Sequence, residues 1–216
     1  MNKIYYQLQL TQVSPLRLSN GENQDTDSDL MRDSQGKPYI PGSSLAGAMR
    51  SHLDTADAEA LFGEIHDDGK NRESRILVSD AVLTNDAAYH ISSRDSVRLD
   101  ENGVAEDTGK FDFEVVECTQ PYTAILEVND LDETSFDAQG TTEKLLSRII
   151  GENGISLGGR TTRGYGHMKV TIKRICFTFP NDMTKWLDFD PLSGKAWDSL
   201  KELKLTVQPD AIYTTV

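Results

Sequence analysis

The chain has 216 residues, 37% of them hydrophobic, which is enough for one well-buried domain. No apolar run has membrane-spanning length, and a formal net charge of −13 argues against a broadly basic face that binds nucleic acid nonspecifically. The two cysteines, Cys118 and Cys176, are far apart and lack neighbours at zinc-finger spacing. We therefore expect reduced thiols in a cytoplasmic protein without a membrane partner.

The N-terminal stretch predicts a strand followed by an acidic loop. Apolar and polar residues alternate over residues 4–11, which is typical of a half-buried strand and unlike the continuous apolar run of a secretory leader. The loop after it is rich in turn-forming residues and carries three closely spaced carboxylates, Asp25, Asp27 and Asp29. On its residues alone, this segment is best explained as a solvated surface loop.

Residues 43–53 predict an amphipathic helix. A Pro-Gly pair precedes it, and an apolar side chain recurs at every fourth position: Leu45, Met49 and Leu53. Ser43 or Ser44 can cap this helix, and its free amides and hydroxyls could bind phosphate. A short second helix is expected over 57–63 and a strand over 74–83.

The middle of the chain predicts an acidic hairpin arm between core elements. Two β-like stretches within 94–117 flank a turn-rich centre. From Asp95 to Asp137 there are thirteen Asp or Glu residues and two Lys or Arg. A core strand is expected over 121–128 and a helix over 141–150.

A basic, glycine-rich loop follows that helix. From Gly158 to Arg174 the chain has five Lys or Arg residues and no Asp or Glu. Glycine lets a ligand approach the backbone closely, and arginine offers a planar fork for phosphate, so the loop predicts an anion site. A flexible hairpin with solvated charges is the simpler alternative. A strand over 168–173 follows, and the apolar phase flips after it, which predicts a bulge or break near Arg174.

The order of elements, β-α-β-β-α-β, predicts an α+β fold of the ferredoxin-like (RRM-like) type. One domain over 1–179 carries the hairpin insertion at about 93–118. Residues 180–216 have a weak pattern and are predicted to form a C-terminal appendage packed on the core.

Four stretches in this order resemble the RAMP superfamily of CRISPR-associated proteins, and most closely the repeating backbone subunit of type III effector complexes. They are GKPYIPGSSLAGAMRSHL, LFGE with SRILVSDA, RDSVRLDENGVAEDTGKFDFEVVE and GISLGGRTTRGYGHMKV. The third resembles the β-hairpin thumb of that subunit. The resemblance covers roughly residues 4–175. It implies guide RNA, target RNA, copies of the chain or related RAMP subunits, and other type III effector subunits as partners.

The resemblance also implies an endoribonuclease site that uses a divalent cation, Mg²⁺ or Mn²⁺. In active members the cleaving Asp lies in the loop after the first strand, six residues before the Asp of an Arg-Asp pair. Arg32-Asp33 is that pair here, and it selects Asp27 as the catalytic and metal-binding residue. Asp25 and Asp29 are close enough to compete for the role.

Guide RNA contacts are implied at the first helix and at the Gly-rich loop. They are Ser43, Ser44, Arg50, Gly158, Gly159, Arg160, Thr161, Arg163 and Gly164. Many members carry lysines at the start of the helix, where this chain has Ala46 and Ala48. Guide binding is therefore expected to depend more on the arginines.

Two other functions stay open. Related RAMP nucleases that process repeat RNA often work without metal and use a helix histidine as general acid or base, a role open to His52. A non-catalytic scaffold that binds guide RNA and leaves cleavage to other subunits is the second alternative. The acidic loop and the long hairpin favour the backbone subunit that cleaves target.

Overall fold

The computed structural model describes residues 3–19, 30–65, 71–84, 87–99, 104–129, 135–178 and 201–202. Its strands are β1 (Lys3–Gln12), β2 (Ile76–Val78), β3 (Tyr89–Leu99), β4 (Ala105–Cys118), β5 (Tyr122–Val128), β6 (Gly151–Ser156), β7 (His167–Thr178) and β8 (Lys201–Glu202). Its helices are α1 (Gly42–Arg50), α2 (Thr55–Phe62), α3 (Ala138–Ile149) and a 3₁₀ turn, η1 (Thr161–Arg163).

The main sheet is antiparallel, with the order β2-β5-β1-β7-β6, and β8 pairs with β7. Strand β1 is central, α1 follows it, and α3 follows β5, which confirms the predicted ferredoxin-like arrangement. Strand β6 was not predicted, because glycines at Gly151 and Gly154 hide its pattern. Of the predicted C-terminal segment, only Lys201–Glu202 lies within the described residues.

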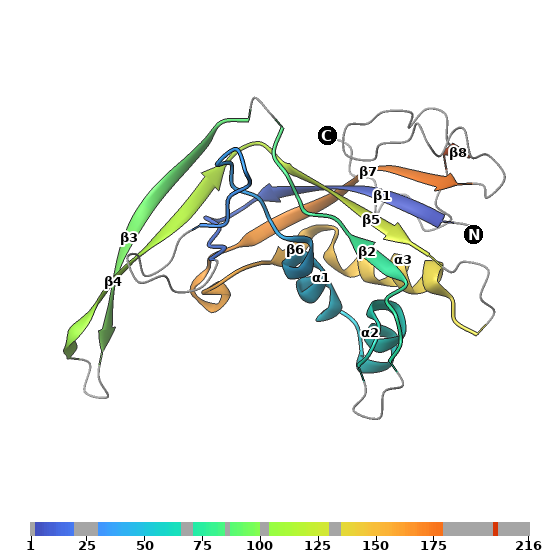
Figure 1. Ribbon diagram of the computed structural model, residues 1–216, viewed down its shortest axis with the longest axis horizontal. Coiled ribbons are helices and arrows are strands. Elements are labelled where there is room, and N and C mark those ends of the chain that lie inside the picture. Colours follow the sequence, from blue (N-terminus) through green and yellow to red (C-terminus); the bar gives the residue numbers. More distant parts are fainter. Residues whose placement is uncertain are drawn as a thin grey trace.

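The core lies between the sheet and its helices, which cover one face of it (Figure 1). Apolar side chains of one face of β1 and of the inner faces of α1 and α3 are buried together: Ile4, Tyr6, Leu8, Leu10, Leu45, Met49, Leu145, Leu146 and Ile149. Each contributes roughly 1.5–3 kcal/mol relative to exposure. The i, i+4 spacing of the helix residues is what aims them at the sheet.

The other face of β1 is also covered. Tyr5 and Gln7, predicted to face solvent on a half-buried strand, are only 2% and 7% exposed. Burial and the neighbouring Glu127 carboxylate raise the pKa of the Tyr5 hydroxyl, so it stays protonated throughout the physiological range. Tyr5 and Glu127 are direct partners across β1 and β5. The first half of the strand is therefore covered on both faces, whereas Gln9 and Thr11 farther along are partly exposed.

The predicted irregularity near Arg174 is a bulge in a continuous strand. Along β1 and β7, Gln7 pairs with Arg174 and Leu8 pairs with Ile172, so Lys173 is the extra residue. An extra residue reverses the side-chain alternation, which explains the flip in apolar phase seen in the sequence.

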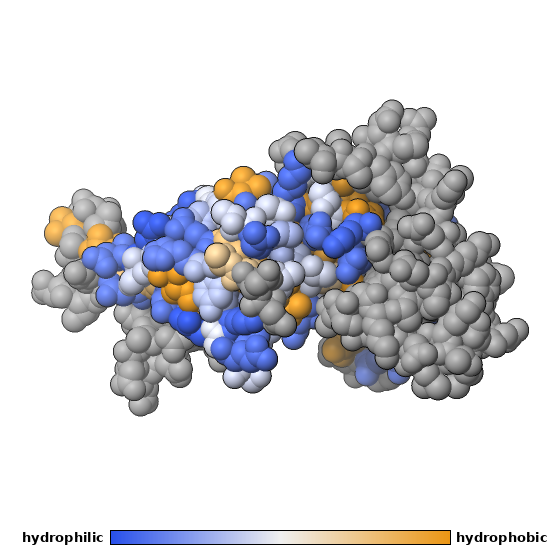
Figure 2. Space-filling model, turned by 90° about the horizontal axis from the view of Figure 1, so that it is seen from above, coloured by the Kyte–Doolittle hydropathy of each residue, from blue (hydrophilic) through white to orange (hydrophobic). Residues whose placement is uncertain are grey.

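Strands β3 and β4 form a separate two-stranded sheet, a hairpin that projects from one end of the molecule (Figure 1). Its pairing runs from Tyr89–Cys118 to Leu99–Ala105, so it begins slightly before the predicted arm. Viewed from above, hydrophilic residues cover most of the described surface and apolar residues form small separate patches (Figure 2). Within the described residues, no helix is long and apolar enough to cross a membrane.

Candidate nucleic-acid interface

The Gly-rich loop between β6 and β7 is packed against the segment that follows β1. The Gly159 N–H donates to the Arg17 carbonyl at 3.0 Å, and the Gly166 N–H donates to the Pro15 carbonyl at 2.8 Å. Gly158 has φ +77°, and a Cβ there would lie 2.0 Å from the Arg17 carbonyl oxygen. The glycine is therefore required by close approach of the chain's own backbone, and the loop is not the flexible hairpin of the simpler alternative.

Arg160 lies against the hairpin. Its guanidinium carbon is 4.4 Å from the ring centroid of Phe113 and 4.8 Å from that of Phe111, and its Nη1 donates to Ser96 Oγ at 3.0 Å. Burial lowers the pKa of the guanidinium, and two neighbouring arginines lower it further. Sequence reasoning placed Arg160 among the RNA contacts but gave no hint of its aromatic partners.

Those neighbours, Arg17 and Arg163, complete a cationic cluster with Arg160. Arg17 lies over Phe113 at 4.8 Å, and its Nε is buried without a hydrogen-bond partner. Among the described residues, none of the three guanidiniums forms an ion pair. Arg163, Thr161 and the glycines of the loop apart from Gly166 are exposed. Like charges gathered without carboxylates create a positive potential that attracts an anion such as phosphate. Sequence reasoning missed Arg17, a lone arginine with no motif around it.

Helix α1 begins one residue earlier than the serines predicted to cap it. Its N-cap is Pro41, which makes no side-chain cap, so Ser43 and Ser44 lie in the first turn and are exposed. The Gly42 N–H donates to the Asp80 carboxylate at 2.7 Å. The protein's own carboxylate therefore satisfies part of the helix N-terminus, and the capping prediction is wrong.

Arg50 ties α1 to α2. Its Nη1 donates to the Gly63 carbonyl at 2.9 Å, and the side chain is half-buried. Gly63 ends α2 with φ +83° and is itself buried. Arg50 therefore has a structural partner in this structure, unlike Arg163.

The acidic loop is closed at its stem. Asp25, Asp27 and Asp29 lie outside the described residues. Before and after them, Ser19 pairs with Leu30 in an antiparallel bridge. Among the described residues, no group of His, Cys, Asp and Glu side chains is arranged to hold a metal ion. The divalent cation and its ligand Asp27 therefore stay predictions.

The Arg-Asp pair that selected Asp27 has structural partners. Arg32 donates through Nη2 to both carboxylate oxygens of Glu114 on β4, at 3.2 and 3.0 Å, and the Leu30 N–H donates to the same carboxylate. Asp33 accepts from the N–H groups of Gln35 and Lys37 and so closes a turn. The end of the acidic loop is thereby fastened to the hairpin.

The root of the hairpin, which we define as Phe111–Cys118 of β4, is held on both faces. Alternation along a strand sends residues 111 and 113 to one face and residues 114 and 116 to the other. The first pair contacts the cationic cluster, and Glu114 contacts the stem of the acidic loop. Val116 also pairs with Leu16 directly after β1. The two candidate functional loops therefore meet at one short stretch of β4.

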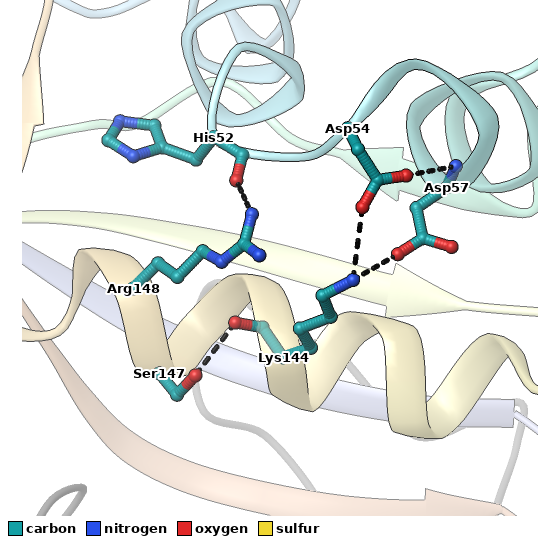
Figure 3. Close-up of polar contacts among 6 residues, drawn as sticks. All are labelled: His52, Asp54, Asp57, Lys144, Ser147 and Arg148. Carbon is teal, nitrogen blue, oxygen red and sulfur yellow. Dashed lines mark hydrogen bonds and ion pairs between the residues drawn. The ribbon is translucent and has the colours of Figure 1, made fainter.

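His52 lies between α1 and α2 in a polar network with α3 (Figure 3). Its carbonyl accepts a hydrogen bond from Arg148, and its imidazole points away from that contact (Figure 3). Asp54 caps α2, and Lys144 donates to Asp54 and Asp57 at 3.1 and 2.5 Å. In the described part of the chain, the imidazole makes no hydrogen bond that would orient it as a general acid or base.

Comparison with known proteins gives a family and a fold. Chains of the type III-B Cmr-beta complex, solved by cryo-EM, are similar in structure: one from the apo state has a TM-score of 0.61 and one from the complex bound to cognate target RNA has 0.59. Both are 13% identical; each match covers 79% of this chain, and 97% and 96% of the respective Cmr chains. No curated protein matches the sequence. The model of the RAMP superfamily matches residues 9–169, which is most of the chain, and the protein therefore belongs to the RAMP superfamily.

Proposed function

We propose that the protein is a backbone subunit of a type III CRISPR effector complex that binds guide RNA and cleaves complementary target RNA. One observation carries this proposal: a cationic loop and the stem of an acidic loop meet on opposite faces of the hairpin root. That arrangement gives a place for RNA backbone beside a place for cleavage. Membership of the RAMP superfamily and similarity to Cmr-beta chains support it.

Guide binding would depend on the exposed part of the cationic cluster. Arg163 is exposed, so its guanidinium suits phosphate oxygens, with the Thr161 hydroxyl nearby. Arg17 is half-buried with a buried Nε, and it adds positive charge to the cluster. Ser43 and Ser44 offer further hydroxyls on the first turn of α1. Backbone contacts of this kind fix position and carry no base information, so guides of any sequence would be accepted.

Cleavage would depend on Asp27. When RNA is cut by its own 2′-hydroxyl, negative charge grows on the phosphate, and a divalent cation bound by a carboxylate would stabilise it. The part played by the described residues is to hold the loop that carries Asp27. Glu114 does so by accepting hydrogen bonds from Leu30 and Arg32 at one end of the loop. The described end of that loop is thereby fastened to the root of the hairpin, as the proposal requires.

Purification of the tagged protein from its native host, followed by sequencing of the bound RNA, tests this function. We expect repeat-derived guide RNA of defined length, further copies of the chain and partner subunits, and cuts in complementary RNA at regular intervals. Bound guide with intact target would make the chain a non-catalytic scaffold. Precursor repeat RNA cut by the protein alone would favour the His52 nuclease.

A further inference from the structure

Arg160 differs from Arg163, the other arginine of its loop, because its side chain already has partners within the chain. Its guanidinium lies over Phe111 and Phe113 and donates to Ser96 Oγ. All three partners belong to the hairpin, and Ser96 on β3 is the direct partner of Phe111 on β4. A planar guanidinium can stack on rings and hydrogen-bond in its plane at once, which an ammonium cannot do.

The backbone at Arg160 is fixed as firmly as the side chain. Its φ of 64° is the one positive value among the described residues other than glycine. Its carbonyl accepts hydrogen bonds from the N–H groups of Arg163 and Tyr165, at 2.8 and 3.4 Å. A left-handed conformation is unfavourable for a residue with a Cβ, so it persists where the surroundings impose it.

Three segments meet on the ring of Phe113. Arg160 and Arg17 lie over it, and Tyr165 approaches edge-on, at 5.8 Å between centroids and 78° between planes. Phe113 is 3% exposed. The loop, the segment after β1 and the hairpin thus share one aromatic centre, which we call the Phe113 junction.

The charge in this junction is not balanced within the described residues. Arg17 and Arg163 both repel the positive charge of Arg160. An anion that arrives beside Arg17 and Arg163 would offset this repulsion. It would then strengthen the contact between Arg160 and the hairpin, because binding and order are linked in both directions.

We propose that Arg160 is a positioning residue that fixes the angle between the hairpin and the Gly-rich loop, and that phosphate bound at Arg163 and Arg17 tightens this contact. This differs from the role of a phosphate ligand that the sequence suggested for Arg160. The ligand half of the proposal rests on the proposed guide-binding function. The positioning half rests on the contacts of the free chain alone.

Hydrogen exchange of the free protein tests the positioning half. We expect Arg160→Lys and Phe111→Leu each to speed exchange of amides in 93–97 and 111–115 by about tenfold, a factor within reach of a lost stacked contact. The double variant should exchange no faster than Arg160→Lys alone, because that variant already removes the stacking that Phe111→Leu weakens. Arg163→Lys, on the same loop but exposed, is the matched control and should exchange as wild type.

Both variants should fold normally, so a change in hairpin exchange would report on positioning alone. Phe111 is half-buried and Lys keeps the charge of Arg160, so both variants should retain the circular dichroism spectrum of wild type. Unchanged hairpin exchange in both would overturn the positioning role. Exchange that rises equally in the helices would show general destabilisation and would overturn it as well.

Poly(U) RNA tests the coupling, since phosphate contacts need no particular sequence. We expect it to slow hairpin exchange in wild type and to have a smaller effect in Arg160→Lys. Arg163→Ala should lose severalfold more affinity for poly(U) than Arg160→Ala, which removes the same charge. The reverse order would make Arg160 a phosphate ligand and overturn the proposal. If poly(U) and guide RNA both fail to bind, the proposed function fails, while the exchange of the free chain still decides the positioning role.

Discussion

At the scale of single residues, identical side chains three positions apart have different surroundings. Arg160 is stacked on two rings, whereas Arg163 is exposed. The sequence RTTRG shows both as equivalent candidates for phosphate. What separates them is a contact with Phe111 and Phe113, about fifty positions away, that only the fold brings together. A local sequence pattern predicts helices and strands, but it does not reveal contacts between residues that are distant in the sequence.

Gly158 and Gly159 provide a test of the loop's packing. Gly158→Ala should destabilise the protein by at least about 1–2 kcal/mol, because its φ is positive and its Cβ would meet the Arg17 carbonyl. Gly159→Ala is the matched control: its Cβ would lie 3.5 Å from the Arg17 side chain at ordinary contact distance. Thermal or denaturant unfolding of the two variants measures the difference. Equal stabilities would contradict the packed loop described here.

Asp27→Asn tests the proposed cleavage residue. The change is nearly isosteric and exchanges an anionic oxygen for a neutral amide, so it weakens a divalent cation at that position. Target RNA should still pair with the guide in the reconstituted complex but remain uncut on a denaturing gel. Wild type in EDTA should behave in the same way.

Asp25→Asn and Asp29→Asn are the matched controls and should reduce cleavage less. If Asp29→Asn alone abolished cleavage, the mechanism would stand and Asp29 would be the cleavage residue. Cleavage that survives both Asp27→Asn and EDTA but disappears in His52→Ala would transfer the function to repeat-RNA processing.

At the scale of elements, strand β4 connects parts that are distant in sequence. Its root contacts the Gly-rich loop through Phe113, the acidic loop's stem through Glu114 and the end of β1 through Val116. Gln12 strengthens the last of these, since its amide oxygen accepts from the Cys118 N–H and its amide nitrogen donates to the Val116 carbonyl. The hairpin is therefore a projecting arm whose root also holds three other segments of the chain together.

Glu114→Ala tests the contact between the hairpin root and the stem of the acidic loop. The ion pair with Arg32 is about one-third exposed, so its loss should cost less than about 1 kcal/mol of stability. Hydrogen exchange at Leu30 and Met31 should nevertheless rise, and target cleavage should fall while guide affinity stays unchanged. Glu117→Ala is the matched control, because Glu117 is exposed on the same strand and its contact to Arg94 is a long 3.9 Å. Equal cleavage by both variants would show that the contact of Glu114 with the stem of the acidic loop does not affect cleavage.

The contact between α2 and α3 predicts a pH dependence. The hydrogen bond from Asp57 N–H and the contact with Lys144 lower the pKa of Asp54, and the two carboxylates raise the pKa of Lys144. Asp54 contributes to the free energy of unfolding above its unfolded pKa, and this contribution is lost as pH falls through its folded pKa. Lys144 contributes below its unfolded pKa, and its contribution is lost as pH rises through its folded pKa.

Asp54→Asn should therefore flatten the acid side of the curve of melting temperature against pH, by a small amount because these groups are exposed. The control is Glu59→Gln, which removes one carboxylate from the same helix. Melting curves that coincide with wild type at every acidic pH would show that the contact contributes nothing in solution.

The sequence predicted the regular elements well and their edges less well. The alternation of β1, the four-residue spacing of Leu45 and Met49 in α1 and the hairpin arm are local patterns, and the structure confirms them. Helix α1 ends at Arg50, however, so Leu53, the third residue of the predicted spacing, lies outside it. Strand β2 covers only Ile76–Val78 of the expected 74–83, because Ala81 and Val82 make isolated bridges instead. Those bridges are made to Ile40 and Thr123, partners that local pattern does not reveal.

At the scale of the whole molecule, the uneven charge predicts assembly that depends on salt. The net charge is −13, yet the cationic cluster has no carboxylate partner among the described residues. The acidic hairpin of one copy and the basic loop of its neighbour would attract one another. We expect native mass spectrometry with guide RNA to show multimers at low salt. They should dissociate near 1 M salt, where the screening length is about 3 Å.

A nonionic solute at matched osmotic strength is the control and should leave the multimers intact. A chain that stays monomeric with guide RNA and partner subunits at every salt concentration would speak against a backbone subunit. Dissociation by both salt and the nonionic solute would show that charge is not what holds the copies together.

The bridge between Ser19 and Leu30 has a consequence for how such a protein can diversify. The two ends of the acidic loop are held together at this point, and the hydrogen bond from the Met31 N–H to the Leu18 carbonyl adds to the closure. The free-energy cost of closing a flexible loop grows slowly, by about 0.6 kcal/mol for each doubling of its length. A change of length or sequence between these two ends should therefore cost the fold little, and under the proposed function it would convert a cleaving subunit into a non-cleaving one on the same scaffold.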